Sequence, residues 1–266
     1  MGFLRYYHNM EFASASVSVK YHDIFGYKLT KEEAIKWQYK NQKITIIGIK
    51  NKLRLQREKY SQKKLKIAKK ASELISKIPT VLFVGITGSL AMMNADKNSD
   101  IDLMIITKKN TLWVTRIMVY LVLRIMNYEL RNPNTKKEKD KLCMNLWLDE
   151  QDLIWDKRDR NIYTAHEIAQ IIPLVNKNNI YEKFLYLNRW ILNYWPKAVK
   201  IRGYLEKMMS PDSSLLSSFL HILNIVCFKL QHLYMKPKMT REIVAPTHAI
   251  FHPNNWGEVV IKKLSK

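Results

Sequence analysis

The segment GITGSLAMMNADKNSDIDLMIIT carries two carboxylates, Asp100 and Asp102, in a largely apolar stretch. A strand projects alternate side chains to one face, so both carboxylates point the same way, about 6.6 Å apart along the strand. Carboxylates that close repel each other, and a divalent cation between them removes the repulsion. Mg²⁺ prefers carboxylate, phosphate and water oxygens. The pair therefore predicts a magnesium site of the two-metal kind, in which bound metal and a nucleotide phosphate balance the charge of the carboxylates.

A Gly-Ser pair stands shortly before the two aspartates. Gly88 and Ser89 follow an apolar run and open the helical-looking stretch SLAMM. A glycine lets the backbone approach a phosphate closely, and a helix N-terminus presents free N–H groups. Ten residues separate Ser89 from Asp100, which is enough for a helix, a turn and the start of the next strand. The order predicts that Gly88 and Ser89 hold a triphosphate beside the metal ligands.

Three apolar runs must position these residues. The runs VLFVGI (81–86), IDLMIIT (101–107) and LCMNLWL (142–148) predict buried strands that are neighbours in one sheet. A helix is expected over 111–126, and the charged stretch 131–141 is expected to be a loop. The middle of the chain therefore has the mixed pattern of an α/β (α+β) core.

Gly88-Ser89, ten residues, then Asp100-Ile101-Asp102 resembles the signature of the polymerase-beta-like nucleotidyltransferase superfamily, over roughly residues 80–150. The resemblance implies Mg²⁺-dependent transfer of a nucleoside monophosphate from an NTP such as ATP to an acceptor hydroxyl, with release of pyrophosphate. The acceptor could be RNA, a small molecule or a protein. The whole chain is also similar to nucleotidyltransferase-domain proteins of bacteria and archaea in the stretches YHDIFGYKLTKEEA, GSLAMMNADKNSDIDL, KLCMNLWLDE, YTAHEIAQIIPL and THAIFHPNNW.

One position departs from the superfamily pattern. The superfamily places a third carboxylate on a later strand, where it ligates metal or activates the acceptor hydroxyl, but here that position holds Asn145. An amide cannot serve as a general base. Either Asp149 substitutes as a catalytic carboxylate, or catalysis relies on metal and positioning, or the site is weakened. Arg116, one turn into the following helix, could reach the triphosphate, and a surface ion pair is the alternative.

The flanking regions predict two further parts. In residues 1–79, a period-two stretch (13–19), a helix opened by the capping box Thr30–Glu33 and a strand (44–51) suggest a winged-helix-like module. A basic helix with nine Lys or Arg between 52 and 70 follows it. Residues 80–155 form the core. Residues 156–266 are expected to be an all-helical, acceptor-side domain, with a capping box at Thr164–Glu167 and long helices over 180–206 and 214–235.

Composition bounds the partners. Lys plus Arg number 45 against 23 Asp plus Glu, a formal charge of +22, which favours RNA or DNA bound through the basic N-terminal half. A solvated basic face is the alternative reading. Two cysteines in unrelated contexts argue against a disulfide framework and fit a reducing cytoplasm. The apolar segments 112–126 and 215–234 are interrupted by polar or charged residues, so we expect buried helices and no membrane span.

A second functional class stays open. A nucleic-acid-binding or regulatory protein with a degenerate catalytic core would also have a large positive charge and an amide at position 145. The intact Gly-Ser and Asp-x-Asp pairs argue against it.

Overall fold

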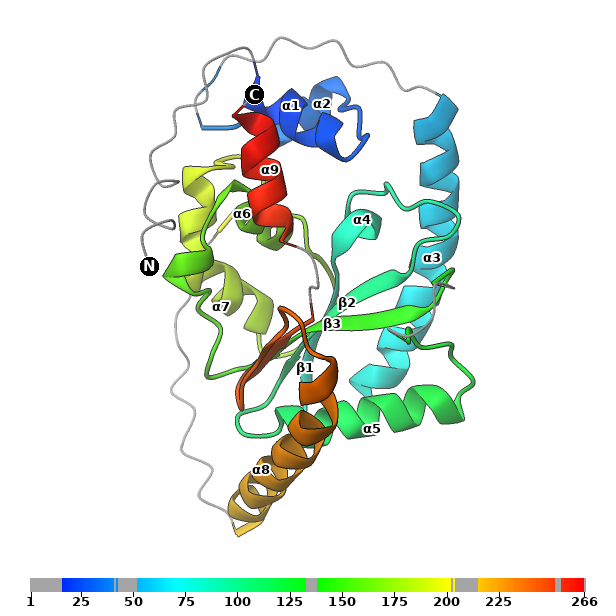
Figure 1. Cartoon of the computed structure of the whole chain (residues 1–266), viewed down its shortest axis with the longest axis vertical. Coiled ribbons are helices and arrows are strands. Elements are labelled where there is room, and N and C mark those ends of the chain that lie inside the picture. The colour runs from blue at the N-terminus through cyan, green and yellow to red at the C-terminus, as the bar shows by residue number, and fades with distance from the viewer. Residues whose placement is uncertain are drawn as a thin grey trace.

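A six-stranded sheet lies at the centre of the computed structural model, which describes residues 16–40, 42, 52–132, 138–201, 203, 215–251 and 255–265 (Figure 1). Its order is β4-β1-β2-β3-β6-β5, with bounds β1 Val81–Ile86, β2 Ile101–Thr107, β3 Leu142–Asp149, β4 Ile172–Asn176, β5 Ile243–Val244 and β6 His248–Ile250. β2 runs antiparallel to β1 and parallel to β3. The three predicted strands are confirmed as neighbours, and the mixed α+β core is confirmed with them.

One face of the sheet packs against α3 (Lys52–Ser76) and α5 (Leu112–Ile125), and α8 (Leu215–Met235) packs on α5 (Figure 1). Period-two alternation turns Leu103 and Ile105 of β2 towards this face. Trp113 of α5 is fully buried against them. The predicted basic helix and the predicted helix over 111–126 are therefore confirmed, and both lie behind the sheet rather than over the aspartates.

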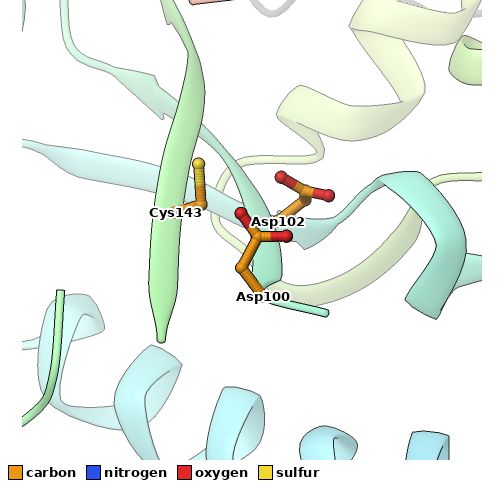
Figure 2. Close-up of side chains that lie close together, drawn as sticks. All are labelled: Asp100, Asp102 and Cys143. Atoms are coloured by element: carbon orange, nitrogen blue, oxygen red, sulfur yellow. The ribbon is translucent and has the colours of Figure 1, made fainter. Parts of the chain in front are cut away.

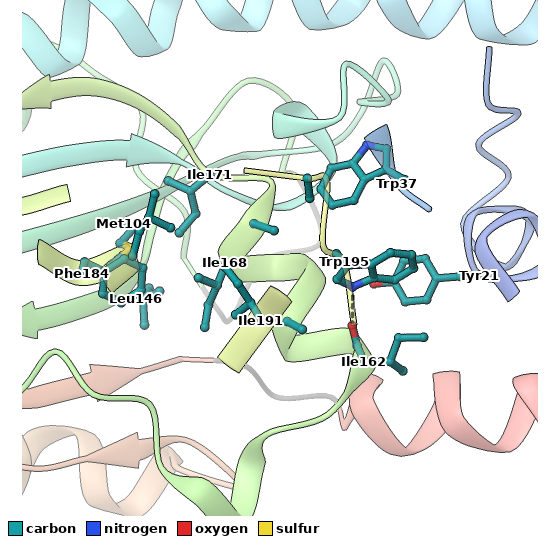
Figure 3. Packing of buried hydrophobic residues seen from close by; sticks show 14 of the residues in the cluster. Tyr21, Trp37, Met104, Leu146, Ile162, Ile168, Ile171, Phe184, Ile191 and Trp195 are labelled. Carbon is teal, nitrogen blue, oxygen red and sulfur yellow. Dashed lines mark hydrogen bonds between the residues drawn. The ribbon is translucent and has the colours of Figure 1, made fainter. Parts of the chain in front are cut away.

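The opposite face carries segments from both ends of the chain. The helices there are α1 (Val17–Ile24), α2 (Lys31–Lys36), α6 (Ile162–Ala169), α7 (Ile180–Leu187) and α9 (Trp256–Leu264). Figure 3 shows their core, in which Met104 of β2 lies near Phe184, while Tyr21 and Trp195 meet further out. The Trp195 indole donates to the Ile162 carbonyl oxygen at 3.2 Å. Asp102 lies on this face of the sheet, because it alternates along β2 with Leu103, which turns towards the other face, and shares a side with Met104.

The N-terminal expectation is partly wrong. The strand expected over 13–19 is contradicted at its described residues, because Ser16 accepts a hydrogen bond from the Val19 amide and caps α1. Val17 and Tyr21 are buried at helical spacing, which overrides the local alternation. The Thr30–Glu33 capping box is confirmed, with both of its hydrogen bonds present. The strand expected over 44–51 lies outside the described residues, so the winged-helix-like module stays a prediction.

The C-terminal expectation of an all-helical domain is wrong. β4 pairs with β1, and β6 pairs with β3, so this part of the chain extends the central sheet. β4 contains Pro173 and has only 5 residues, and β5 and β6 are shorter still, so their local signals are weak. Long-range pairing, which is absent from local patterns, decides these strands.

The expected C-terminal helices also differ in their bounds. Asn161, rather than Thr164, caps α6 by accepting hydrogen bonds from the Tyr163 and Thr164 amides. The long helix expected over 180–206 stops at Leu187, and α8 over Leu215–Met235 is confirmed. The remaining short elements are α4 (Gly88–Ala91), η2 (Lys157–Asp159), η3 (Arg189–Asn193) and η4 (Lys236–Lys238). Among the described residues, no helix combines the length and apolarity that a bilayer crossing requires.

Candidate functional site

The turn after β1 lies directly against the second aspartate. The Thr87 amide donates to the Asp102 carbonyl oxygen at 3.1 Å, and Gly88 then begins α4 with a φ of +60°. A Cβ atom on Gly88 would overlap Oδ2 of Asp102, so only glycine allows this approach. Gly88, Ser89 and Asp102 all line one cavity. The structure thus brings these predicted residues together, and their roles stay predictions.

The two aspartates converge with a cysteine from the neighbouring strand. Asp100 and Asp102 project from the start of β2, and Cys143 projects from β3, where it lies opposite Asp102 (Figure 2). One ligand atom from each of the three side chains lies within 4.8 Å of the other two. Such a group has the size and the oxygen donors that a divalent cation needs.

The charges in this group are not balanced by protein alone. Asp100 Oδ2 forms an ion pair with Arg131 at 2.8 Å. Burial, and then the negative charge of Asp100, raises the pKa of Asp102 to about 7. Burial and the two aspartates raise the pKa of the Cys143 thiol well above its usual range. In the absence of a cation the site therefore tends to keep protons near neutral pH, which a bound divalent cation would displace.

Asn145 holds one of the two carboxylates. The β2–β3 register shifts between Met144 and Leu146, and this bulge lies at Asn145. Its Nδ2 donates to Asp102 Oδ1 at 2.7 Å, while its own Oδ1 is buried and has no hydrogen-bond partner among the described residues. An orphaned buried oxygen beside two carboxylates fits a hard cation such as Mg²⁺. Asp100 and Asp102 are the residues that would hold it.

Asp149 does not join this group. It pairs with Thr107 at the far end of the strands, six residues beyond Cys143, or about 20 Å along β3. Its carboxylate accepts hydrogen bonds from the backbone N–H of Asn110 at 2.6 Å and the backbone N–H of Gln151 at 3.1 Å. Burial raises its pKa to about 7. Asp149 therefore accepts hydrogen bonds from the turns beyond β2 and β3 and lies outside the group of Asp100, Asp102 and Cys143, so the alternative in which it replaces the third carboxylate gains no support from its position.

Arg116 also lies apart from the cavity lining. Its Nη1 donates to Gln231 Oε1 of α8 at 2.6 Å, and its guanidinium lies over the Phe251 ring. Phe251 lines the cavity, whereas Arg116 stands behind it. Among the described residues that line the cavity, Arg131 is the cation. It is held there because the chain beside it pairs with the start of β3. Sequence reasoning missed Arg131, because it treated this residue only as the first of the charged residues in an expected loop.

The cavity has a volume of about 290 Å³ and lies between the sheet and the helices of the N- and C-terminal segments. Its aromatic lining is Tyr21, Phe25, Tyr27, Tyr163, Phe251 and Trp256. Its polar lining includes Glu167, which sequence reasoning named only as part of a capping box, and the neighbouring His166. A cavity that combines aromatic walls with convergent carboxylates can hold a nucleotide-sized ligand.

Residues 64–187 match the family model described as a nucleotidyltransferase domain. A mutant of the toxin-antitoxin MntA–HpeT is 12% identical, covering 51% of this chain and 88% of its own, with a TM-score of 0.24. The STING-associated CdnE c-di-GMP synthase from Capnocytophaga granulosa is 15% identical, covering 78% of each chain, with a TM-score of 0.29. No curated protein matches the chain.

Proposed function

We propose that the protein transfers a nucleoside monophosphate from an NTP to an acceptor hydroxyl, because residues 64–187 match the family model described as a nucleotidyltransferase domain. The acceptor oxygen attacks the α-phosphorus, the bond from that phosphorus to the bridging oxygen breaks, and pyrophosphate leaves. Positioning and charge stabilisation dominate such reactions.

The observation that carries this proposal is the contact between the Gly88 turn and the Asp102 carboxylate within one cavity. Asp100 and Asp102 would hold Mg²⁺, which supplies positive charge to the phosphates when bound. The backbone of Gly88 and the hydroxyl of Ser89 would orient the triphosphate beside them. Ser89 is exposed and lines the cavity, so its hydroxyl is available to a ligand.

The aromatic walls suit the base of the nucleotide. The Phe25 and Tyr163 rings stack with centroids 6.3 Å apart, and the Trp256 ring lies 5.7 Å from that of Phe25. Flat apolar rings at the edge of a charged site can stack on a base of any identity. The arrangement supports nucleotide binding without selecting one NTP.

Arg131 is proposed to balance the charge of Asp100 while no cation is bound. Its guanidinium contacts Asp100 at 2.8 Å and Glu138 at 2.7 Å. When a cation binds to the aspartates, Arg131 can turn from Asp100 towards the phosphates, for which a guanidinium is a strong donor.

The direct test incubates the protein with each labelled NTP, Mg²⁺ and separate fractions of total cellular RNA, protein and metabolites. We expect one fraction to gain label together with stoichiometric pyrophosphate. The Asp102→Asn variant is the control and should transfer none. Pyrophosphate and label that are equal for both proteins, or absent from both, would contradict the proposal.

A second candidate function is nucleic-acid binding through α3. Its exposed cations include Lys59, Lys63, Lys66 and Lys70, whose spacing places them on one stripe of the helix. Other cations of the same helix turn inward: Lys64 donates to Asp140 at 2.6 Å and Arg57 donates to Asn94 at 2.9 Å. The exposed stripe alone is therefore the candidate phosphate-binding surface, and it could serve an RNA acceptor as well as a regulatory partner.

A further inference from the structure

Glu167 faces the same cavity as Asp102, from a different layer of the fold. Tyr163, Glu167 and Gln170 of the chain at α6 are spaced by four and three residues, so they share one side of the helix. All three line the cavity, together with Asp102 and Asn145 of the sheet. The cavity therefore has one carboxylate on its helical wall, Glu167, and another on its sheet wall, Asp102.

The strands of the site do not provide a proton acceptor for the acceptor hydroxyl. Asn145 has no basic atom to accept a proton at neutral pH, and its amide donates to Asp102. Asp149 lies six residues beyond Cys143, about 20 Å along β3. Among the described residues that line the cavity, Asp102 and Glu167 are the carboxylates. Asp102 is assigned to the cation, so Glu167 is the remaining carboxylate that can take a proton from the acceptor hydroxyl.

We propose that Glu167 is the general base of this transferase. It takes the proton from the acceptor hydroxyl as that oxygen attacks the α-phosphorus of the NTP. The electron pair of the O–H bond forms the new O–P bond, the bond between the α-phosphorus and the bridging oxygen breaks, and its electrons leave with pyrophosphate. This inference rests on the proposed nucleotidyl transfer and assigns the acceptor side of the same cavity.

The surroundings of Glu167 suit a proton acceptor. Gln170 donates to its Oε1 at 2.7 Å, and no hydrogen bond to Oε2 is found among the described residues. Burial, together with the charge of Asp102, raises the pKa of Glu167 to about 8. A base works best with a pKa near the working pH. The titratable and charged groups that share its cavity are Tyr21, His22 and Tyr27 of the N-terminal segment, Tyr163 and His166 of α6, Asp102 of β2 and Arg131.

Packing does not explain this carboxylate. Within the part of the chain that the structure describes, no cation forms an ion pair with Glu167, and its hydrogen-bond partner is the neutral side-chain amide of Gln170. A partly buried carboxylate without a cation costs stability, whereas a glutamine of the same shape would not. The acid is therefore expected to weaken the fold at the pH where it is ionised.

The test compares Glu167→Gln with Asp149→Asn, since both remove a carboxylate of raised pKa and only the first lies in the cavity. The measurements are kcat and KM for transfer from labelled NTP to the fraction that wild type labels, from pH 6 to 9, and the thermal shift caused by Mg²⁺ plus NTP. We expect Glu167→Gln to lose about 10²–10⁴-fold in kcat, as loss of a general base does. Its KM for NTP and its thermal shift should stay close to those of wild type.

The pH profile separates a base from a structural residue. The wild-type rate should rise with pH through a midpoint at or below about pH 8 towards a plateau above it, and Glu167→Gln should lose this rise. Asp149→Asn should keep both the rate, within about threefold, and the rise. A Glu167→Gln variant with wild-type kcat would overturn the inference while leaving the proposed function intact. A wild type that transfers no label and shows no thermal shift would overturn both.

Discussion

The side-chain amide of Asn145 donates a hydrogen bond to Asp102 Oδ1 at 2.7 Å, in the place where the superfamily pattern calls for a third carboxylate. The bond ties β3 to β2 and leaves Oδ2 of Asp102 against the Gly88 turn. By donating this hydrogen bond, Asn145 offsets the repulsion between the carboxylates while no cation is bound. A carboxylate in its place would add to the repulsion until a cation bound.

The Asn145→Asp variant tests this relationship. We expect it to unfold more easily than wild type in EDTA at pH 8, by about 1–3 kcal/mol, because a buried donor is replaced by a third negative charge. Added Mg²⁺ should stabilise the variant more than wild type. Thermal unfolding with and without Mg²⁺ measures both effects, and a variant as stable as wild type in EDTA would contradict this account.

The Asp102→Asn variant tests the cation site. The folded pKa of Asp102, about 7, is above that of the unfolded chain, so the native state binds the proton more tightly. Its contribution to stability is complete below about pH 4 and is lost as the pH rises through 7. The variant, measured in EDTA, should therefore be as stable as wild type or more stable at pH 8, with a flatter dependence on pH.

The same variant should lose its response to ligand. Wild type should gain about 2.7 kcal/mol from Mg²⁺ plus NTP at one hundred times the dissociation constant, through mass action. Asp102→Asn should gain little. Equal thermal shifts in the two proteins would refute the assignment of Asp102 as a metal ligand and would favour the nucleic-acid-binding alternative.

The Gly88→Ala variant has a close control in Gly26→Ala. The two glycines have φ values of +60° and +63°, so the backbone strain of an alanine is nearly the same, about 1–2 kcal/mol. A Cβ at Gly26 would meet only the end of the Arg57 side chain, whereas at Gly88 it would overlap Asp102. We expect both to lose stability and only Gly88→Ala to lose NTP binding. Calorimetric titration checks this, and matched NTP affinities would exclude a role for the Gly88 turn.

A buried histidine pair should make the fold sensitive to acid. His22 Nδ1 lies 2.7 Å from the Ser18 carbonyl oxygen, and its Nε2 lies 3.1 Å from Nε2 of His166. Burial lowers the pKa of His22 to about 4 and that of His166 well below its usual value. Because these folded pKa values are depressed, their contribution is present above about pH 6.5 and is lost as the pH falls towards 4.

The variant His166→Gln keeps a donor towards His22 and removes one of the two acid-sensitive groups. Its midpoint of urea unfolding should fall less steeply than that of wild type between pH 6.5 and 4. His221→Gln, at an exposed position of α8, is the control and should follow wild type. If the urea midpoint of His166→Gln depended on pH as steeply as that of wild type, the histidine pair would not be the cause of the sensitivity to acid.

The exposed lysine stripe of α3 should bind nucleic acid with strong salt dependence. Each neutralised phosphate contributes about 0.9 to the log–log salt slope on duplex DNA. Changing Lys59, Lys63, Lys66 and Lys70 together to Gln should lower that slope by up to about 3.6, and Lys229→Gln on α8 should leave it unchanged. Fluorescence anisotropy at several salt concentrations measures the slope. A wild-type affinity that does not change with salt concentration would show that the lysine stripe is a solvated face.

Local patterns carried the centre of the fold. Continuous apolar runs predicted β1, β2 and β3, since burial of both faces of a strand leaves its mark on consecutive residues. The alternation of side chains along a strand placed Asp100 and Asp102 on one face, and the Thr30–Glu33 box identified the start of α2. These features depend on residues within a few positions of one another, which is why the sequence alone was sufficient for them.

Only the tertiary structure decided what surrounds the aspartates. The register of β3 against β2 placed Cys143 opposite Asp102 and carried Asp149 to the far end, and a single bulge turned Asn145 to Asp102. Docking of α6 brought Glu167 to the cavity from 65 positions further along the chain than Asp102. Such placements depend on the pairing of strands and the burial of helices between distant segments. Their free energy comes from contacts across the whole core, and no short stretch of sequence contains it.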